Sequence, residues 1–329
     1  MIKKIKSLSP DPFLNKTKGD TQFAKLAHLN NIVDQINNNN FATPTLQEVT
    51  TSGNTTTDDL ILNGARLGCD ANKALLYFGG IPLNGNTGNN VTAIGIFTAA
   101  TNSGNNVIAI GDSTAQNNSG NNLTALGYAA GYTNQGNNVI AIGNNTAWYN
   151  KGNTVIGLGD SAAKSNEGYV ITAIGNYAGY NNKGSSVTAL GNSAASGNTK
   201  DSVVAIGDHA GYNNTGLGLT AIGNSAGESN SGNAVTALGY NAAKSNTQYA
   251  VTAIGISTGE SNSGNNIVAL GGYSAYSNSG NNIIVLGQSA ANRNQGNHVV
   301  AIGNYSAYQN TYHNVIMICL LYTSDAADD

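Results

Sequence analysis

The chain repeats a 16-residue unit without insertion from Val91 to Asn314, which gives fourteen consecutive copies. The copy at 107–122 reads VIAIGDSTAQNNSGNN, and a fifteenth copy begins at Val315. A period this short and this strict means that each unit is one small structural element stacked on its neighbours. Repeats built from helices are about 33 residues or longer, and Gly and Asn at this density would destabilise helices. The repeat therefore excludes an α-helical solenoid.

The unit has positions with distinct structural requirements, which we number so that Val107 is position 1 and Asn122 is position 16. Positions 1 to 4 are aliphatic residues with small Ala and occasional Thr, a composition typical of a short strand. Position 5 is Gly in all fourteen copies, which indicates a corner or a close approach of the backbone. Positions 8 and 9 are always small, so a second run of chain can lie close against the first.

Position 12 is Asn in every copy, and Gly follows two residues later in most of them. Asn tolerates left-handed backbone and bonds to its own main chain in turns. Asn side chains stacked at the same height in successive coils can also form a hydrogen-bonded ladder. We expect a structural ladder of Asn102, Asn118, Asn134, Asn150, Asn166, Asn182, Asn198, Asn214, Asn230, Asn246, Asn262, Asn278, Asn294 and Asn310.

Together these features predict an all-β fold, a parallel β-solenoid (β-roll) of about fourteen 16-residue coils. Each coil is expected to hold two short strands and two corners. Successive coils would be joined by parallel main-chain hydrogen bonds, about 4.8 Å apart.

The two faces of the strand predict how the chain associates. Residues at positions 1 and 3 point to one side and residues at positions 2 and 4 to the other. A 16-residue coil is thin, so position 1, the Ala at position 3 and the small residues opposite can fill it. Position 4 then forms an exposed apolar strip, which we expect identical chains to bury against one another around a common axis. In the alternative, a monomer fills its core with position 4. The strip comprises Ile94, Ile110, Leu126, Ile142, Leu158, Ile174, Leu190, Ile206, Ile222, Leu238, Ile254, Leu270, Leu286 and Ile302.

The chain divides into four segments. Residues 1–44 form an N-terminal segment whose apolar spacing predicts an amphipathic helix at about 21–38. Residues 45–90 are expected to be a β lead-in or cap, and 91–316 the solenoid. The last segment, 317–329, resembles a translated sequencing adapter. We therefore expect that tail to be non-native, and the true C-terminus, with any chaperone or anchor domain, to be missing.

Charge and apolar runs argue against several classes of partner. Charged residues make up 9 % of the chain, and the net charge is −3. In the repeats these charges are scattered and nearly balanced, so no basic stripe exists for a nucleic acid. No run of about 18 apolar residues predicts membrane insertion. No signal-peptide core follows the initial lysines, so we expect folding in a cytoplasm.

No constellation of side chains indicates catalysis. The four His and two Cys residues are scattered. Asp occurs at position 6 only at Asp112, Asp160 and Asp208, which is too sparse for stacked calcium sites. We therefore expect no enzymatic activity, no catalytic residues, no metal and no cofactor.

Aromatic residues are the best candidates for surface binding. They recur at positions 7 and 10, and three copies hold a Tyr-x-x-Tyr pair. Exposed rings offer flat faces with polar tips, suited to stacking on sugars or to protein contacts. The alternative is a purely structural row, stacked along the rod or packed at a seam between chains. The candidates are Tyr132, Trp148, Tyr177, Tyr180, Tyr212, Tyr273, Tyr276, Tyr305 and Tyr308.

The unit V-x-A-I-G-x-S-A-A-x-x-N-x-G-N-N resembles the YadA-like head repeat of trimeric adhesins, read as S-V-A-I-G-x-x-A, over residues 91–314. The resemblance implies a left-handed parallel β-roll, three of which form a non-enzymatic trimer. The repeats are also similar to those of phage tail fibres, and 45–64 resembles the lead-in segments of such fibres. The autotransporter members carry a signal peptide, a membrane anchor and a stalk coiled coil; this sequence shows none of these patterns, so we expect the chain to depart from those members.

The resemblance implies a fibre or spike of a phage virion, assembled in the host cytoplasm, that attaches to a glycan or protein of the host surface. The alternative is a head fragment of a bacterial trimeric autotransporter-like adhesin on the outer surface. A solenoid enzyme would need clustered carboxylates and Arg, and this sequence has no such cluster. An ice-binding protein needs regular outward Thr, and Thr fills position 2 only intermittently.

Overall fold

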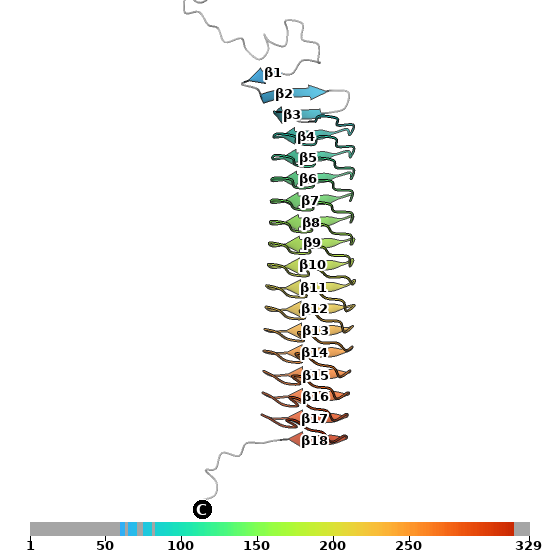
Figure 1. Cartoon of the computed structure of the whole chain (residues 1–329), viewed down its shortest axis with the longest axis vertical. Coiled ribbons are helices and arrows are strands. Elements are labelled where there is room, and N and C mark those ends of the chain that lie inside the picture. The colour runs from blue at the N-terminus through green and yellow to red at the C-terminus, as the bar shows by residue number, and fades with distance from the viewer. Residues whose placement is uncertain (1–59, 63–64, 71–74, 81–82, 319–329) are drawn as a thin grey trace, which may run out of the picture. The chain divides into compact units, whose positions relative to one another are not determined.

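The computed structural model describes residues 60–62, 65–70, 75–80 and 83–318. They form a parallel β-solenoid of about fifteen coils, with no helix among them, in which one four-residue strand recurs every 16 residues (Figure 1). This confirms the predicted all-β solenoid and its period. The helix predicted at 21–38 lies outside the described residues. The repeated strands are β4 (Val91–Ile94), β5 (Val107–Ile110), β6 (Leu123–Leu126), β7 (Val139–Ile142), β8 (Val155–Leu158), β9 (Ile171–Ile174), β10 (Val187–Leu190), β11 (Val203–Ile206), β12 (Leu219–Ile222), β13 (Val235–Leu238), β14 (Val251–Ile254), β15 (Ile267–Leu270), β16 (Ile283–Leu286), β17 (Val299–Ile302) and β18 (Val315–Ile318).

Every coil is stacked on the next in the same register. In β10 and β11, Val187 pairs with Val203 and Leu190 with Ile206, and the same offset of 16 residues holds from β4 to β18. Equivalent side chains therefore form straight columns along the stack. At about 4.8 Å per strand, the coils rise by roughly 70 Å.

The solenoid begins one coil earlier than the repeat pattern indicates. Strand β3 (Leu75–Gly79) pairs in parallel with β4, with Leu75 opposite Val91. Before it, β1 (Leu60–Leu62) and β2 (Ala65–Asp70) run antiparallel, and β2 pairs with β3. The β1–β2 hairpin thus covers the first edge of the parallel sheet, which would otherwise present unpaired backbone groups.

The return half of each coil is not a strand, so the prediction of two strands per coil is wrong. In the coil that starts at Ile171, the φ values of Tyr177, Gly179 and Asn181 are 54°, 60° and 51°. The N–H of Gly179 donates to the following coil, whereas those of Tyr177 and Asn181 donate to the preceding one. The intervening N–H groups, such as that of Tyr180, donate to the carbonyl three residues earlier. Left-handed backbone at every second residue makes this half a series of tight turns.

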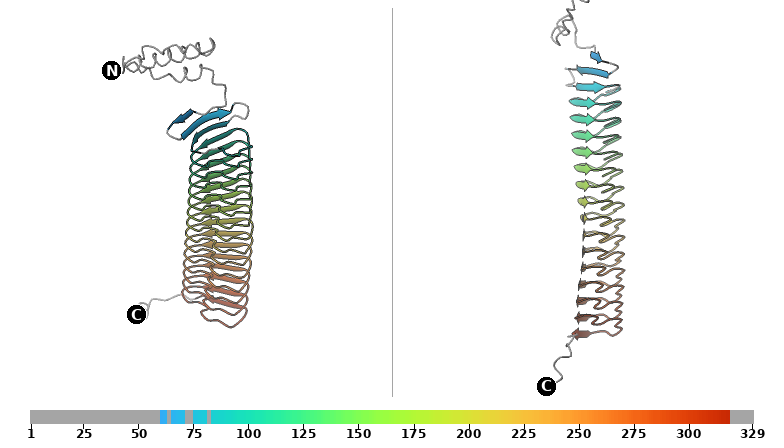
Figure 2. Two further views of the ribbon diagram at one scale, coloured as in Figure 1. Left: turned by 45° about the horizontal axis from the view of Figure 1, so that its top comes forward. Right: turned by 90° about the vertical axis from the view of Figure 1, so that its left-hand side faces the viewer.

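The core is a thin column enclosed by the strand and the turn run. Positions 1 and 3 are buried in every coil from β4 to β17, and the small residues of positions 8 and 9 pack against them. Val203 and Ala205, for example, have no exposed surface, whereas Ile206 is half-buried on the outside. The alternative packing, with position 4 in the core and positions 1 and 3 outside, is therefore wrong. Figure 2 shows the strands on one side of the stack and the turn runs on the other.

Candidate functional site

The outer face of the strands is a continuous apolar surface. Every position-4 residue from Ile94 to Ile302 is half-buried or exposed, for example 39 % exposed at Ile110 and 51 % at Leu286. The β-pairing aligns these side chains into one column, and position 2 adds a parallel column of Thr, Val and Ile. Monomeric soluble proteins rarely expose so long an apolar strip, so this face has the character of an interface.

The asparagines of position 12 form a buried ladder. The Nδ2 of Asn134 donates to Oδ1 of Asn118 over 2.9 Å and to the carbonyl of Gly136 over 2.8 Å. The same bond between coils joins the position-12 side chains from Asn86 to Asn310. Their φ values are not positive, so these residues are not in left-handed backbone. The side-chain amide explains Asn at this position, and its burial and full pairing make it part of the framework.

The Gly at position 14 in most copies allows close stacking, although Lys200, Gln248 and Tyr312 take its place in the others. A Cβ on Gly120 would lie 1.9 Å from the carbonyl oxygen of Gly136 and 2.7 Å from Nδ2 of Asn134. The ladder and the absence of a side chain at position 14 are therefore linked. The Asn amide of each coil lies where a Cβ at position 14 of the preceding coil would be.

Two further Asn ladders, which the sequence analysis does not single out, lie at the outer corner of positions 15 and 16. The backbone N–H of Asn105 donates to Oδ1 of Asn121 over 2.9 Å, and its Nδ2 donates to the same atom over 3.2 Å. At position 16, Nδ2 of Asn106 donates to Oδ1 of Asn122 over 2.9 Å. The Asn-Asn pair that ends five of the fourteen units is the sequence signal that could have revealed these ladders.

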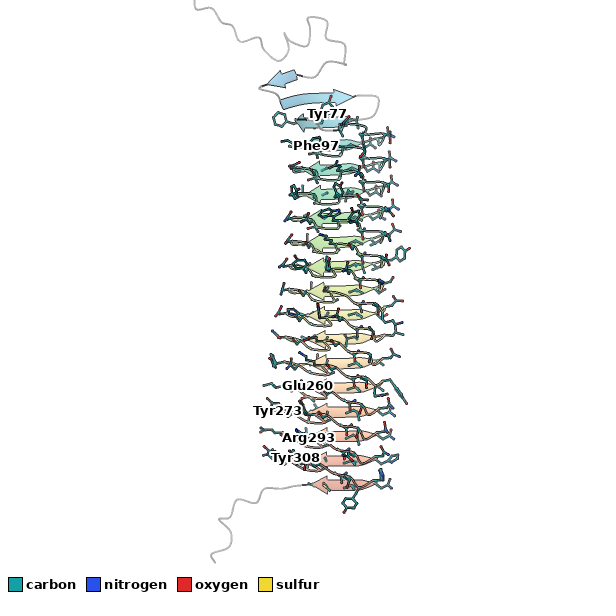
Figure 3. The ribbon with its side chains drawn as sticks, in the orientation of Figure 1. Tyr77, Phe97, Glu260, Tyr273, Arg293 and Tyr308 are labelled. Carbon is teal, nitrogen blue, oxygen red and sulfur yellow. The ribbon has the colours of Figure 1, made fainter. Side chains whose placement is uncertain are left out.

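The predicted aromatic residues project from the turn runs and contact one another in local groups. The rings of each Tyr-x-x-Tyr pair lie in one coil, with centroids 5.5 Å apart for Tyr177 and Tyr180. The other two pairs are 6.3 Å and 5.8 Å apart; Figure 3 labels Tyr273 and Tyr308 from them. His209 takes the place of the first ring against Tyr212, at 5.4 Å.

A second aromatic group spans two coils. Tyr132 lies edge-on to Trp148 at 5.3 Å, and Tyr149 stacks on Trp148 with centroids 5.7 Å apart. The Nζ of Lys164 lies 4.4 Å from the Trp148 ring centroid, a cation–π contact. The buried Nε1 of Trp148 has no hydrogen-bond partner among the described residues, nor has Oδ1 of Asn145. Tyr149, at position 11, was missed because no other copy has an aromatic residue there.

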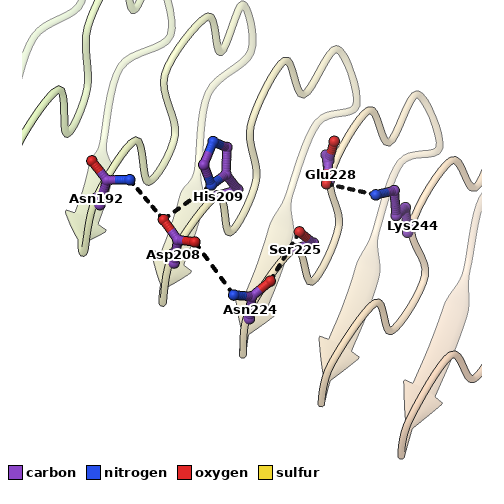
Figure 4. A network of polar contacts seen from close by, with 7 residues as sticks. All are labelled: Asn192, Asp208, His209, Asn224, Ser225, Glu228 and Lys244. Carbon is purple, nitrogen blue, oxygen red and sulfur yellow. Dashed lines mark hydrogen bonds and ion pairs between the residues drawn. The ribbon is translucent and has the colours of Figure 1, made fainter.

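A polar network crosses three coils in the middle of the solenoid (Figure 4). Asp208 accepts hydrogen bonds from Nδ2 of Asn192 at 2.8 Å and from Nδ2 of Asn224 at 3.3 Å, and it contacts Nδ1 of His209 at 3.0 Å. The bond from Asn192, followed by that from His209, lowers the pKa of Asp208 below its ordinary value. These contacts stabilise the carboxylate form of Asp208 on the surface.

Two ion pairs link neighbouring coils on the surface. Partial burial acts to raise the pKa of Glu228, but hydrogen bonds from Lys244, 2.9 Å away, and from Ser225 outweigh it and lower the pKa. The hydrogen bond from Lys151, over 3.0 Å, lowers the pKa of Glu167. Both pairs join equivalent positions 16 residues apart, so each links one coil to the next.

Within the described ranges, no three His, Cys, Asp or Glu side chains gather where they could hold a metal ion. No helix in that part of the chain has the length and apolar character needed to cross a bilayer. A scan against protein-family models finds no match to the chain. A search of curated proteins finds no significant relative.

Proposed function

We propose that the chain is a non-enzymatic attachment protein, the shaft of a homotrimeric fibre or spike of a phage virion that adheres to a glycan or protein on the host surface. The observation that carries this proposal is the outward column of Ile and Leu at position 4, aligned over the whole solenoid. A strand that is apolar on both faces is stable when both faces are covered.

Association of identical chains covers this surface most simply. All coils present the same two columns, so chains aligned side by side bring equivalent apolar residues together along their entire length. The number three rests on the resemblance of the unit to trimeric adhesin head repeats. In such an assembly the strand faces meet at the common axis, and the turn runs with their rings stay outside.

The attachment role is supported by the aromatic groups on the turn runs. Tyr177, Tyr273 and Tyr305 each expose about half of their surface, and each contacts a second ring within its coil. Paired rings of this kind suit stacking on sugars or on apolar groups of a protein.

The oligomer is tested by light scattering on the purified full chain and on Ile206→Asp. We expect three chains per particle for the wild type and dissociation for Ile206→Asp, because a carboxylate in the apolar interface would be desolvated. Ser231→Asp is the matched control: Ser231 is exposed on another face, at the unit position where Glu167 occurs naturally. A monomeric wild type, or an Ile206→Asp variant that keeps its mass, would overturn the trimer.

The attachment role is tested separately by adsorption of the fluorescently labelled full chain to bacterial cells, measured by sedimentation. We expect saturable adsorption to a subset of strains. A trimeric chain that adsorbs to none of a broad strain panel would contradict the attachment role.

A further inference from the structure

The Asn ladder at position 15 is interrupted in the middle of the solenoid by large apolar residues. Tyr169, Leu217 and Tyr249 replace Asn there and are 54 %, 49 % and 52 % exposed. Asn occupies this corner in all coils from Asn89 to Asn153 and again from Asn265 to Asn297. The change is therefore confined to one stretch of one corner, which we name the central corner (positions 14–16, residues 168–250).

Each replacement leaves a backbone donor without a protein partner. Where the ladder is intact, the N–H of Asn137 donates to Oδ1 of Asn153 over 2.7 Å. The N–H groups of Asn153, Asp201 and Asn233 face Tyr169, Leu217 and Tyr249 in the next coil. None of the three finds an acceptor among the described residues. Three hydrogen bonds of the position-15 ladder are thus absent at the same places where large apolar side chains are exposed.

The central corner also contains a depression of about 470 Å³, open to solvent, lined by Thr199, Lys200, Asp201, Leu217 and Asn233. Lys200 stands at position 14, where most coils have Gly. Asp201 keeps one carboxylate oxygen on the N–H of Ser185, at 2.7 Å. The lining combines an apolar platform with hydroxyl, amide and carboxylate groups, and its two charges are of opposite sign.

We propose that the central corner binds an uncharged oligosaccharide that lies along the stack from Tyr169 to Tyr249. The assignment rests on the proposed attachment function and names its ligand class and its site. The rise per coil, about 4.8 Å, is close to the length of one pyranose in an extended glycan. Consecutive sugars therefore meet consecutive position-15 residues. The tyrosines stack on sugar rings at the two ends, and Leu217 packs under the middle.

The polar groups of the central corner match the hydroxyls of such a ligand. The unpartnered N–H groups of Asp201 and Asn233 donate to sugar oxygens, and the carboxylate of Asp201 accepts from sugar hydroxyls. Because the charges of Lys200 and Asp201 balance, a neutral glycan needs no counter-charge at this place. An acidic glycan would meet the carboxylate directly.

The test uses the full chain and its variant Tyr169→Asn/Leu217→Asn/Tyr249→Asn, which restores the Asn found at position 15 in other coils. Binding of maltohexaose, cellohexaose and chitohexaose is measured by saturation-transfer NMR and calorimetry. We expect the wild type to bind at least one of the three and the variant to lose about tenfold or more in affinity. The variant should melt at the same or a higher temperature, because the ladder is rebuilt.

A matched control removes exposed rings that have no proposed binding role, by Tyr128→Asn/Tyr240→Asn at position 6, where Asn is common. It should leave hexasaccharide binding unchanged. The proposal is overturned if the wild type binds none of the three sugars, if the variant with Asn at position 15 keeps the affinity, or if the position-6 variant loses it. It is also overturned if the position-15 variant dissociates in light scattering, because the central corner is then a contact between chains. Cell adsorption retained by the position-15 variant would leave the attachment function standing without this site.

Discussion

Asn182 donates a hydrogen bond from its side-chain Nδ2 to Oδ1 of Asn166, exactly one coil earlier, over 2.8 Å. Its own Oδ1 accepts from Asn198 in the following coil, also over 2.8 Å. Both amide groups are buried, so this bond joins coils in a place that water does not reach. The solenoid is thus held by a polar column inside and by parallel β-pairing on its wall.

Replacing Asn182 by Ala is expected to destabilise the chain by about 3 kcal/mol, because the side-chain amides of Asn166 and Asn198 and the carbonyl of Gly184 lose their partner. Asn121→Ala, which removes a half-buried amide from the outer ladder, should cost about 1 kcal/mol. Urea unfolding followed by circular dichroism compares the two variants. Equal effects would show that burial of the inner ladder adds nothing.

Gly191→Ala is expected to disrupt stacking at its corner and to cost more than about 2 kcal/mol. Gly191 has a φ of +133°, and an added Cβ would lie 2.5 Å from the carbonyl oxygen of Gly207. Gly272→Ala is the control, because its Cβ would meet nothing nearer than 3.9 Å. That variant should be neutral or slightly more stable, since Ala restricts the unfolded chain. Thermal melting of both proteins measures the contrast.

The Asp208 network predicts a pH dependence at the acid end. The pKa of Asp208 in the folded chain lies below its ordinary value of 3.8, so the contribution is fully present above that pH and is lost as the pH falls through the folded pKa. Asn192→Ala removes the strongest hydrogen-bond donor and should raise the pKa of Asp208 toward 3.8. NMR titration of the carboxyl carbon measures this shift. An unchanged titration would assign the effect to other groups.

The ion pair of Lys151 and Glu167 should contribute little to stability, because both side chains are about half exposed. Glu167→Gln is expected to lower the melting temperature much less than Asn182→Ala does. Any difference from wild type should disappear in about 1 M salt, where the screening length is short. A large, salt-independent loss would mean that this pair is structural.

The period and the assignment of inner and outer positions could be predicted from the sequence because they depend on residue type alone. In every copy the buried positions 1 and 3, such as Val203 and Ala205, precede an outward position 4, such as Ile206. A Gly, such as Gly207, follows at the corner. The return half could not be predicted, because the positions in left-handed backbone, such as those of Tyr177 and Asn181, hold different residue types from copy to copy. Stacking of many identical coils makes that backbone conformation stable, through hydrogen bonds that only the assembled coils can make.

The first coil and the central corner were not predicted from the sequence, for two different reasons. Leu75 begins a segment, LLYFGG, that differs from V-x-A-I-G although Gly79 keeps the corner, so its sequence does not mark it as a coil. Tyr169 and Tyr249 fall outside positions 7 and 10, where most of the rings recur, so they belong to neither of those rows. These tyrosines stand out because they interrupt the Asn ladder at position 15, and that ladder is visible in the structure.

Because each coil from Val91 onward presents the same register to the next, deleting 16 residues between equivalent positions leaves two ends that fit. Unequal recombination within the gene would therefore lengthen or shorten the solenoid in steps of about 4.8 Å, and the joined coils would still pair in register. The length of the solenoid can thus change in evolution while the surface residues of the remaining coils stay the same.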